Sequence, residues 1–474
     1  MNGELPKGWV WTSLGEVTEN PQYGWTTRAT TEGNVHLLRT TDITSGKIDW
    51  SSVPYCEEEP EDIQKYLLKE GDIVISRAGS VGYSYLLDNP QNSIFASYLI
   101  RFKPLINNCF LSYFLKSPIY WEAISEKSIG IAMANVNAPK LKQIEIPLPP
   151  LAEQQRIVNK IEELFTNLDK GIESLEQVKY KLKVYRQAIL KHAMEGKLTE
   201  KWREENKNRV ESEILQLIKS LKEKQKIMTD DNSNDLDDTY SPSSWVRLRL
   251  MELTKTINPG FPCGRHNNEG RGVLHVRPMN IDREGRISLV NTKYVETNIY
   301  DSLGKGDILF NNTNSSELVG KTTYIESDTN WAYSNHMTRI RINNPLVNNK
   351  WISTYLHFLF LSGYFGGICI HHVNQSSVSI RVLSEKIPIP IPSISEQNFI
   401  LQIIDQYFSI VDKEFETINY LLEQSKNLRQ SILKKAFEGK LVPQYPNEES
   451  AEILLENIKN QKSNKEKLIQ EKMR

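Results

Sequence analysis

Several short segments of this 474-residue chain contain residue types that could carry chemistry. Gly320-Lys321-Thr322 resembles the end of a phosphate-binding loop, but such a loop needs a glycine where this chain has Ser315. Asn20-Pro21-Gln22-Tyr23 resembles the Asn-Pro-Pro-Tyr motif of adenine methyltransferases, but its third residue differs and no Gly-rich cofactor loop precedes it. We therefore interpret the first segment as a turn, and we expect neither phosphate binding nor methyl transfer.

Two further patterns could hold a metal ion. Glu195-x-Lys197 and Glu438-x-Lys440 match half of a nuclease motif, but both are expected at helix ends without an acidic partner in a strand. His371-His372 could bind a metal, but neighbouring side chains point apart and no carboxylate cluster lies nearby. No Gly-x-Ser-x-Gly, His-Glu-x-x-His or Gly-x-Gly-x-x-Gly motif occurs. We predict no catalytic residue, no metal site and no cofactor, and hence a binding protein.

The composition is that of a globular protein with reduced thiols. The net charge is −1, so DNA binding would require local basic patches rather than a uniformly cationic surface. The four cysteines, Cys56, Cys109, Cys263 and Cys369, form no Cys-x-x-Cys pattern. The N-terminus lacks the apolar region of a signal peptide. The longest apolar stretch, Trp351 to Ile370, is interrupted by His357 and glycines, and we predict a buried helix followed by a loop. We expect a cytoplasmic protein.

The chain contains an internal repeat with an offset of 243 residues. The segment from Gln187 to Leu198 (QAILKHAMEGKL) matches the segment from Gln430 to Leu441 (QSILKKAFEGKL). At the same offset, Ile144-Glu145-Ile146-Pro147 matches Ile387-Pro388-Ile389-Pro390, and Glu153-Gln154 matches Glu396-Gln397. A period this long indicates a duplicated two-part unit rather than a solenoid array.

The repeat extends upstream with shorter offsets, as loop insertions would cause. The equivalent residues are Trp9 and Trp245, Leu14 and Leu250, Glu16 and Glu252, Arg39 and Arg277, the Gly-Asp-Ile segments at Gly71 and Gly306, and Arg101 and Arg339. Downstream, Glu213-Ile214-Leu215 resembles Glu452-Ile453-Leu454. The plan is a domain, a helix and a tail, repeated once.

Apolar residues at gaps of three and four predict a long helix after each Pro-rich segment. The predicted seams are Ile157, Ile161, Leu164, Leu168, Ile172, Leu175, Val178, Leu182, Tyr185 and Ile189, and Ile400, Ile404, Tyr407, Val411, Phe415, Ile418, Leu421, Ser425, Leu428 and Ile432, in which only Ser425 is polar. Each helix should span ~40 residues, or ~60 Å, and end at Gly196 or Gly439. Such narrow apolar stripes should pack on each other. The connectivity predicts an antiparallel pair with one domain at each end.

We predict an α+β fold with two similar, mostly antiparallel β domains joined by two long antiparallel coiled-coil helices. The predicted boundaries are 1–150 for the first domain, 151–198 for its helix, 199–243 for a tail helix and an acidic linker that begins near Thr229, 244–392 for the second domain, 393–441 for its helix, and 442–474 for the last tail.

The two domains differ greatly between their shared positions. Residues 76–83 read SRAGSVGY, whereas residues 311–321 read NNTNSSELVGK. One scaffold with different loops is what two readers of two DNA sequences need, because Arg, Lys, Asn, Gln, Ser and Thr can bond base edges, and Tyr or Trp can position phosphates. The candidate DNA contacts are Tyr23, Trp25, Arg28, Arg39, Arg77, Ser80 and Lys103 in the first domain, and Arg265, Arg271, Arg277, Asn312, Asn314, Lys321, His336 and Arg341 in the second.

Over nearly its whole length, this ordered and duplicated set of motifs resembles the specificity subunits of type I restriction–modification systems. The set comprises the Trp…Leu-x-Glu openings, the Gly-Asp-Ile segments, the Ile-Pro-x-Pro…Glu-Gln starts of the helices and their Glu-Gly-Lys-Leu ends. The second Pro-rich segment departs from the pattern, since it reads Pro388-Ile389-Pro390-Ile391-Pro392-Ser393.

The resemblance implies two target-recognition domains, each reading one half of a split site in double-stranded DNA, and a helix pair that fixes the gap between the halves. It also implies that the helices and tails bind two methyltransferase (modification) subunits, which carry S-adenosylmethionine and methylate adenine. Motor–nuclease (restriction) subunits would complete the complex.

Two alternatives stay open at the level of the sequence. The same scaffold could serve a fused or non-type-I methyltransferase, with the same DNA reading and other partners. A coiled-coil scaffold protein without DNA recognition would instead keep its loops constant among relatives.

Overall fold

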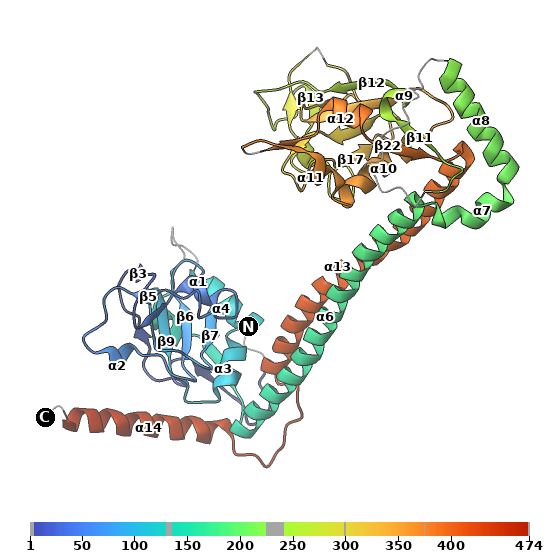
Figure 1. Ribbon diagram of the computed structural model, residues 1–474. Helices are drawn as coiled ribbons and strands as arrows, with labels where there is room; N and C mark the ends of the chain where they lie inside the picture. Colours follow the sequence, from blue (N-terminus) through green and yellow to red (C-terminus); the bar gives the residue numbers. More distant parts are fainter. Residues whose placement is uncertain (1–3, 129–134, 224–240, 298–299, 374, 473–474) are drawn as a thin grey trace. The chain divides into compact units, whose positions relative to one another are not determined.

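Unit 1 of this protein is built from both ends of the chain, and unit 2 from its middle. Unit 1 consists of Met1–Glu176 and Ile418–Arg474, and unit 2 of Gln177–Thr417. The structure is a computed structural model that describes residues 4–128, 135–223, 241–297, 300–373 and 375–472 (Figure 1). The acidic linker predicted from Thr229 lies almost entirely outside the described residues.

The first domain, from β1 to β10, contains two four-stranded sheets. One has the order β2-β9-β6-β7 and is antiparallel, and the other has the order β3-β5-β4-β8 with β4 and β8 parallel. The strands are β1 (Val10–Ser13), β2 (Gln22–Tyr23), β3 (Ala29–Thr30), β4 (His36–Leu38), β5 (Tyr55–Cys56), β6 (Ile73–Ser76), β7 (Ser84–Leu86), β8 (Ser93–Phe95), β9 (Leu99–Phe102) and β10 (Glu145–Leu148). The helices are α1 (Thr40–Ile43), α2 (Ile63–Tyr66), α3 (Asn108–Phe114), α4 (Pro118–Ser128) and α5 (Ala138–Lys142). Both β6 and β9 are buried along their whole length, as their apolar runs require.

The second domain, from β11 to β22, repeats this design. Its antiparallel sheet has the order β12-β19-β15-β17, and a smaller sheet, β14-β13-β18, again contains one parallel pair, β13 and β18. The strands are β11 (Val246–Arg249), β12 (Thr254–Pro259), β13 (Val273–Val276), β14 (Tyr294–Val295), β15 (Ile308–Asn311), β16 (Thr313–Asn314), β17 (Thr322–Tyr324), β18 (Ala332–Tyr333), β19 (Met337–Ile342), β20 (Ile370–His371), β21 (Ser376–Ser377) and β22 (Pro388–Ile391). The helices are α9 (Leu250–Leu253), η2 (Pro278–Asn280), α10 (Asn349–Leu361), α11 (Tyr364–Ile368) and α12 (Ile380–Glu385).

The predicted α+β class and the mostly antiparallel pairing are confirmed. The sequence did not reveal the parallel pair in each domain. The buried helix predicted from Trp351 exists as α10, but the predicted loop after it instead contains α11 and the start of β20. A short antiparallel pair, β1 with β10 and β11 with β22, brings the start of each domain beside its Pro-rich end.

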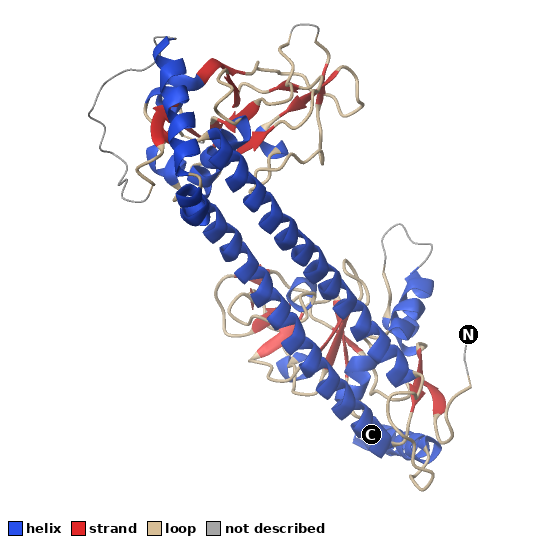
Figure 2. Ribbon diagram, turned by 90° about the vertical axis from the view of Figure 1, so that its right-hand side faces the viewer, coloured by secondary structure: helices blue, strands red, loops and turns tan. Residues whose placement is uncertain are grey.

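Two 44-residue helices, α6 (Leu151–Met194) and α13 (Ile394–Phe437), follow the domains. The glycines just beyond them, Gly196 and Gly439, have φ of 68° and 69°, the left-handed conformation that ends helices, as predicted. The two helices are antiparallel within each unit and lie side by side there (Figure 2). In unit 1, Asp169 of α6 pairs with Arg429 of α13, and in unit 2, Arg186 of α6 pairs with Asp412 of α13.

The predicted apolar seam is wrong by one residue at several positions. Val178 and Tyr185 of α6, and Tyr407, Leu421 and Leu428 of α13, are exposed. Their neighbours Lys179, Arg186, Phe408, Leu422 and Arg429 are partly buried instead. An ideal helix drifts relative to a 3.5-residue repeat, and the aliphatic stems of Lys and Arg can occupy a seam.

A tail helix covers the domain of each unit. In unit 1, α14 (Ala451–Lys472) buries Ala451 and Ile458 in the core of the first domain, and the ammonium of Lys462 donates to the carbonyls of Gly15 and Glu16 at 2.8 Å. The same core contains Phe437 at the end of α13, whose ring lies 5.2 Å from that of Phe110.

In unit 2, the chain after α6 forms η1 (Lys197–Thr199), α7 (Glu200–Glu205) and α8 (Lys207–Glu223). Leu217 and Leu221 of α8 are buried in the core of the second domain. Glu213 accepts from the backbone N–H of Ser395 at 3.0 Å. Within the described part of the chain, none of the helices combines the length and apolar character that a membrane crossing needs.

Candidate nucleic-acid interface

The repeated Gly-Asp-Ile and Arg motifs form a buried ion pair in each domain. Asp72 lies 3.5 Å from Arg101, and Asp307 lies 3.9 Å from Arg339. The carboxylates also accept the backbone N–H groups of Lys69 and Gly304. Burial raises the pKa of Asp72 and lowers that of Arg101. These motifs hold two central strands of the sheet through contacts within the domain.

The repeated motif at the start of each long helix also has a structural role. The indole of Trp9 donates to Glu153, and that of Trp245 donates to Glu396, both at 3.0 Å. Gln154 and Gln397 accept the backbone N–H of Asn107 and Asn348 at 3.2 and 2.7 Å. The duplicated residues therefore fix each domain to its helix, which leaves the residues that differ for recognition.

Some candidate contacts of the first domain are exposed, and others are partly buried and bonded to neighbouring residues. Arg28, Ser80 and Tyr23 are exposed, although the Tyr23 hydroxyl accepts from the backbone N–H of Ala138 at 2.9 Å. The guanidinium of Arg77 lies 5.2 Å from the Tyr23 ring centre. The remaining three, Trp25, Lys103 and Arg39, are partly buried; Trp25 donates to Glu58 and Arg39 forms a paired hydrogen bond with Asp42.

Arg265 and Arg271 of the second domain are exposed, and Arg271 lies between Glu269 and Glu296 at 2.9 and 3.0 Å. Arg341 binds Asp307 at 2.6 Å, so its charge supports the buried framework pair.

Two candidates, Lys321 and Asn312, are buried, and their polar groups bond to their own domain. The ammonium of Lys321 donates to the carbonyls of Pro278 and Ile281, and burial lowers its pKa. The amide of Asn312 donates to the backbone of Asn335 at 3.2 Å and to the hydroxyl of Thr338 at 2.8 Å. Both residue types suit base contacts, but here they hold loops of their own domain.

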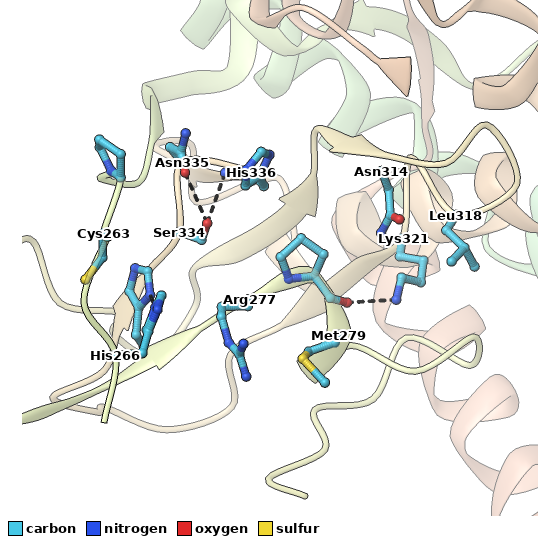
Figure 3. Close-up of a pocket in the computed structure, with 14 residues that line it drawn as sticks. Cys263, His266, Arg277, Met279, Asn314, Leu318, Lys321, Ser334, Asn335 and His336 are labelled. Atoms are coloured by element: carbon cyan, nitrogen blue, oxygen red, sulfur yellow. Dashed lines mark hydrogen bonds between the residues drawn. The ribbon is translucent and has the colours of Figure 1, made fainter. Parts of the chain in front are cut away.

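A pocket of about 690 Å³ lies on the second domain (Figure 3). Four candidates, Arg277, Asn314, Lys321 and His336, line it. So does Asn335, an exposed residue that our sequence reasoning missed. His266 and His275, also at this pocket, share a hydrogen bond of 2.9 Å, and burial lowers the pKa of His275 to about 4. Among the described residues, no group of three or more His, Cys, Asp or Glu side chains is placed to hold a metal ion.

A model of the type I restriction modification DNA specificity domain matches residues 6–180 and 242–424. The chain belongs to this family. It is accordingly a non-catalytic DNA-specificity subunit, as its duplicated architecture suggested.

Full-length relatives agree with the family match. The EcoKI specificity subunit of Escherichia coli K12 is 27% identical over 496 residues, covering 96% of both chains, and the StySPI specificity subunit of Salmonella potsdam is 27% identical with the same coverage. A structure solved to explain complex assembly and conformational transition of the type I R-M system matches with a TM-score of 0.65 at 19% identity, over 93% of this chain and 100% of the other. The HsdS subunit of Thermoanaerobacter tengcongensis matches with 0.52 at 19% identity, over 92% and 98%. These two structures share the fold of this specificity subunit.

In this specificity subunit, sequence reasoning also missed Tyr98, an exposed ring in the first domain. A signal was present, since Arg101 and Arg339 are equivalent, and Tyr98 and His336 each lie three residues before them. His336 was a candidate, so its counterpart should have been one too.

Proposed function

We propose that this chain reads a bipartite site in double-stranded DNA for a type I restriction–modification complex, with one half-site for each domain. The duplicated framework carries this proposal. The buried Asp–Arg pair and the Trp–Glu bond occur in both domains, whereas the loops between them differ. Retained scaffolds with divergent loops are what two different half-sites require.

Exposed basic residues of the domains would contact phosphates and set a salt-dependent affinity. Arg28 in the first domain, and Arg265 and Arg271 in the second, are exposed and suit this role. Specificity would come from loop side chains at base edges, among them Ser80, Arg77, Arg277, Asn314 and His336. Tyr23, Trp25, Lys103 and Arg39 would position the backbone of the DNA.

The helices α6 and α13 would fix the gap between the half-sites and bind two modification subunits. Apolar side chains stand exposed on them: Val178, Tyr180, Val184, Tyr407 and Ile410 in unit 2, and Tyr420 and Leu428 in unit 1. Several exposed apolar side chains along one helix pair suit a protein interface. The modification subunits would supply S-adenosylmethionine and methylate adenine after it is flipped out of the stack. Restriction subunits would complete the complex in the cytoplasm.

Single-molecule methylation sequencing tests this function. DNA from cells that express this chain with its neighbouring modification subunit is compared with DNA from cells that express the modification subunit alone. We expect a new bipartite methyladenine motif only with this chain. Unchanged methylation, with the complex shown to assemble, would instead support a scaffold without DNA recognition.

A further inference from the structure

One turn in each domain has the same backbone hydrogen bonds but different side chains. In the first domain it comprises residues 96–98, between β8 and β9, and in the second residues 334–336, between β18 and β19. The N–H of Ser97 donates to Trp25 at 3.0 Å, and that of Asn335 donates to Phe261 at 3.2 Å. We call these two segments the reading turns.

The surrounding backbone fixes both reading turns in the same way. The N–H of Arg77 donates to the carbonyl of Tyr98 at 2.9 Å, and that of Asn312 donates to His336 at 3.1 Å. A glycine N–H donates to the first residue of the strand after each turn. The N–H of Gly24 donates to the carbonyl of Leu99 at 3.1 Å, and that of Gly260 to the carbonyl of Met337 at 3.0 Å.

Both glycines are required by close approach of the backbone. A Cβ on Gly24 would lie 2.2 Å from the carbonyl oxygen of Ala96, and one on Gly260 would lie 2.0 Å from that of Tyr333. The same restriction in both domains places the two reading turns in equivalent, rigid positions. A rigid support of this kind is what a base-reading side chain needs.

The side chains at the reading turns differ in their chemistry. The first turn presents Ser97 and Tyr98, a residue that is 61% exposed, and the second presents Asn335 and His336. Asn can bond adenine at two atoms, Ser can bond any base, and the Tyr hydroxyl and the His imidazole can each donate or accept.

Neighbouring residues support the reading turns, and the hydroxyl of Ser334 donates to the side-chain oxygen of Asn335 at 3.3 Å, which leaves the amide NH₂ of Asn335 and a second lone pair of that oxygen for a base. In the second domain, the buried amide of Asn312 holds the backbone of Asn335, so Asn312 is a positioning residue. Asn335 and His336 lie at the pocket with Arg277 and Asn314 (Figure 3). In the first domain, Arg77 bonds the turn through its backbone, and its guanidinium stacks on Tyr23.

We propose that the reading turns contact base edges and determine the sequence of the two half-sites: Ser97 and Tyr98 for one, Asn335 and His336 for the other. Asn335 reads an adenine in its half-site. This proposal rests on the proposed function and assigns base recognition to these four residues.

Exchanging the turns tests the proposal. The variants S97N/Y98H and N335S/H336Y place each pair of side chains on the backbone that already accommodates it in the other domain. Methylated motifs are mapped in cells that also express the modification subunit. We expect each variant to change the preferred bases in a different half-site and to leave the other half-site and the gap unchanged. Q64A and E326A, which remove exposed side chains of the two domains, should keep the parental motif.

If a variant loses methylation altogether, a DNA-binding measurement shows whether its base preference has changed. The purified complex is titrated with duplexes that carry single base changes in each half-site. N335A should lose discrimination of at least about 5-fold at an adenine of one half-site, while E326A keeps it. Unchanged discrimination at every position, or unchanged motifs in both exchange variants, would overturn the assignment of the turns. Absence of any bipartite motif with the parental chain would instead refute the proposed function.

Discussion

The guanidinium of Arg186 in α6 lies 2.6 Å from the carboxylate of Asp412 in α13 and 3.8 Å from the ring centre of Phe408. In unit 1, Arg429 makes the same two contacts with Asp169 and Phe165. Each of the three residues lies 243 positions from its counterpart, so the offset of the sequence repeat reappears as a repeated contact between the helices.

These two ion pairs should differ in strength because they differ in exposure. The side chains of Arg186 and Asp412 are 13% and 37% exposed, whereas those of Arg429 and Asp169 are 34% and 61% exposed. We expect D412A, which also removes the ion pair of Asp412 with Arg286 at 3.5 Å, to lower the free energy of unfolding by about 1–2 kcal/mol and D169A by less than about 1 kcal/mol. Urea unfolding of the full chain measures both, and an equal or reversed order would contradict the argument.

The two Trp–Glu bonds should respond differently to loss of charge. Glu396 also binds Arg203 at 2.8 Å and Thr199 at 2.7 Å. E396Q removes one partner of a buried ion pair and should destabilise unit 2 by about 3 kcal/mol.

Its counterpart, Glu153, has a raised pKa because of burial. Its folded state therefore binds a proton more tightly than the unfolded chain does, and the ionised form costs stability at neutral pH. E153Q should leave the melting temperature unchanged or raise it slightly, because a glutamine carbonyl can still accept from the Trp9 indole. Equal losses in E153Q and E396Q would show that the charge has no separate role.

Acid should destabilise the second domain. Burial lowers the pKa of His357 and of His275 to about 4, from an ordinary value of 6.5. Between these values the unfolded chain binds protons that the folded domain does not, so the free energy of unfolding falls as the pH drops from 6.5 towards 4. H357Q should be less stable at pH 7 but lose less on acidification. Urea midpoints at pH 7 and pH 5 test this, and parallel slopes for both proteins would contradict it.

The length of the helix pair should set the gap in the DNA site. One added heptad in α6 after Glu176 and one in α13 after Thr417 lengthens the pair by about 10 Å. We expect the unmethylated gap to grow by about three base pairs, with both half-sites unchanged. A heptad in only one helix is the matched control and should abolish the motif. An unchanged gap in the double insertion would rule out the helices as the ruler.

The exposed apolar side chains of the helices should hold the modification subunits. V184E places a charge on α6 at a side chain that is 48% exposed, so it removes only part of the packing of this residue within the chain. We expect V184E to reduce co-purification of the modification subunit at least 10-fold while the melting temperature of the chain stays within about 1 °C. K183E, at an adjacent exposed position, changes charge without removing an apolar contact. Equal loss in both variants would indicate an electrostatic interface instead.

The order of domains and long helices could be predicted because the same motifs occur twice in the sequence. The Glu-Gly-Lys-Leu segments located both helix ends, and Gly196 and Gly439 have the conformation that they imply. The predicted seam was wrong near Val178 and Tyr185, because a pattern of apolar residues cannot show that the guanidinium of Arg186 packs on the ring of Phe408.

The candidate site was harder to predict, because residue type does not reveal burial. Lys321 and Asn312 have side chains that could bond bases. In the structure these side chains donate instead to the backbone carbonyls of Pro278 and Asn335. Asn335 was not predicted, because its position depends on a backbone hydrogen bond to Phe261. That residue is 74 positions away in the sequence and shares no motif with it.

The composition of unit 1 from both chain ends has a consequence during translation. The first domain emerges from the ribosome early, but Phe437, which packs on Phe110 and Phe114, and Ile458 of α14 are synthesised last. At roughly 5–20 residues per second, the nascent domain waits on the order of tens of seconds for them. Unit 2, a single continuous segment, is complete before that. The domain that is synthesised first is therefore the last to complete its core. A messenger RNA truncated after the codon for Thr417 would yield a chain in which only unit 2 is complete.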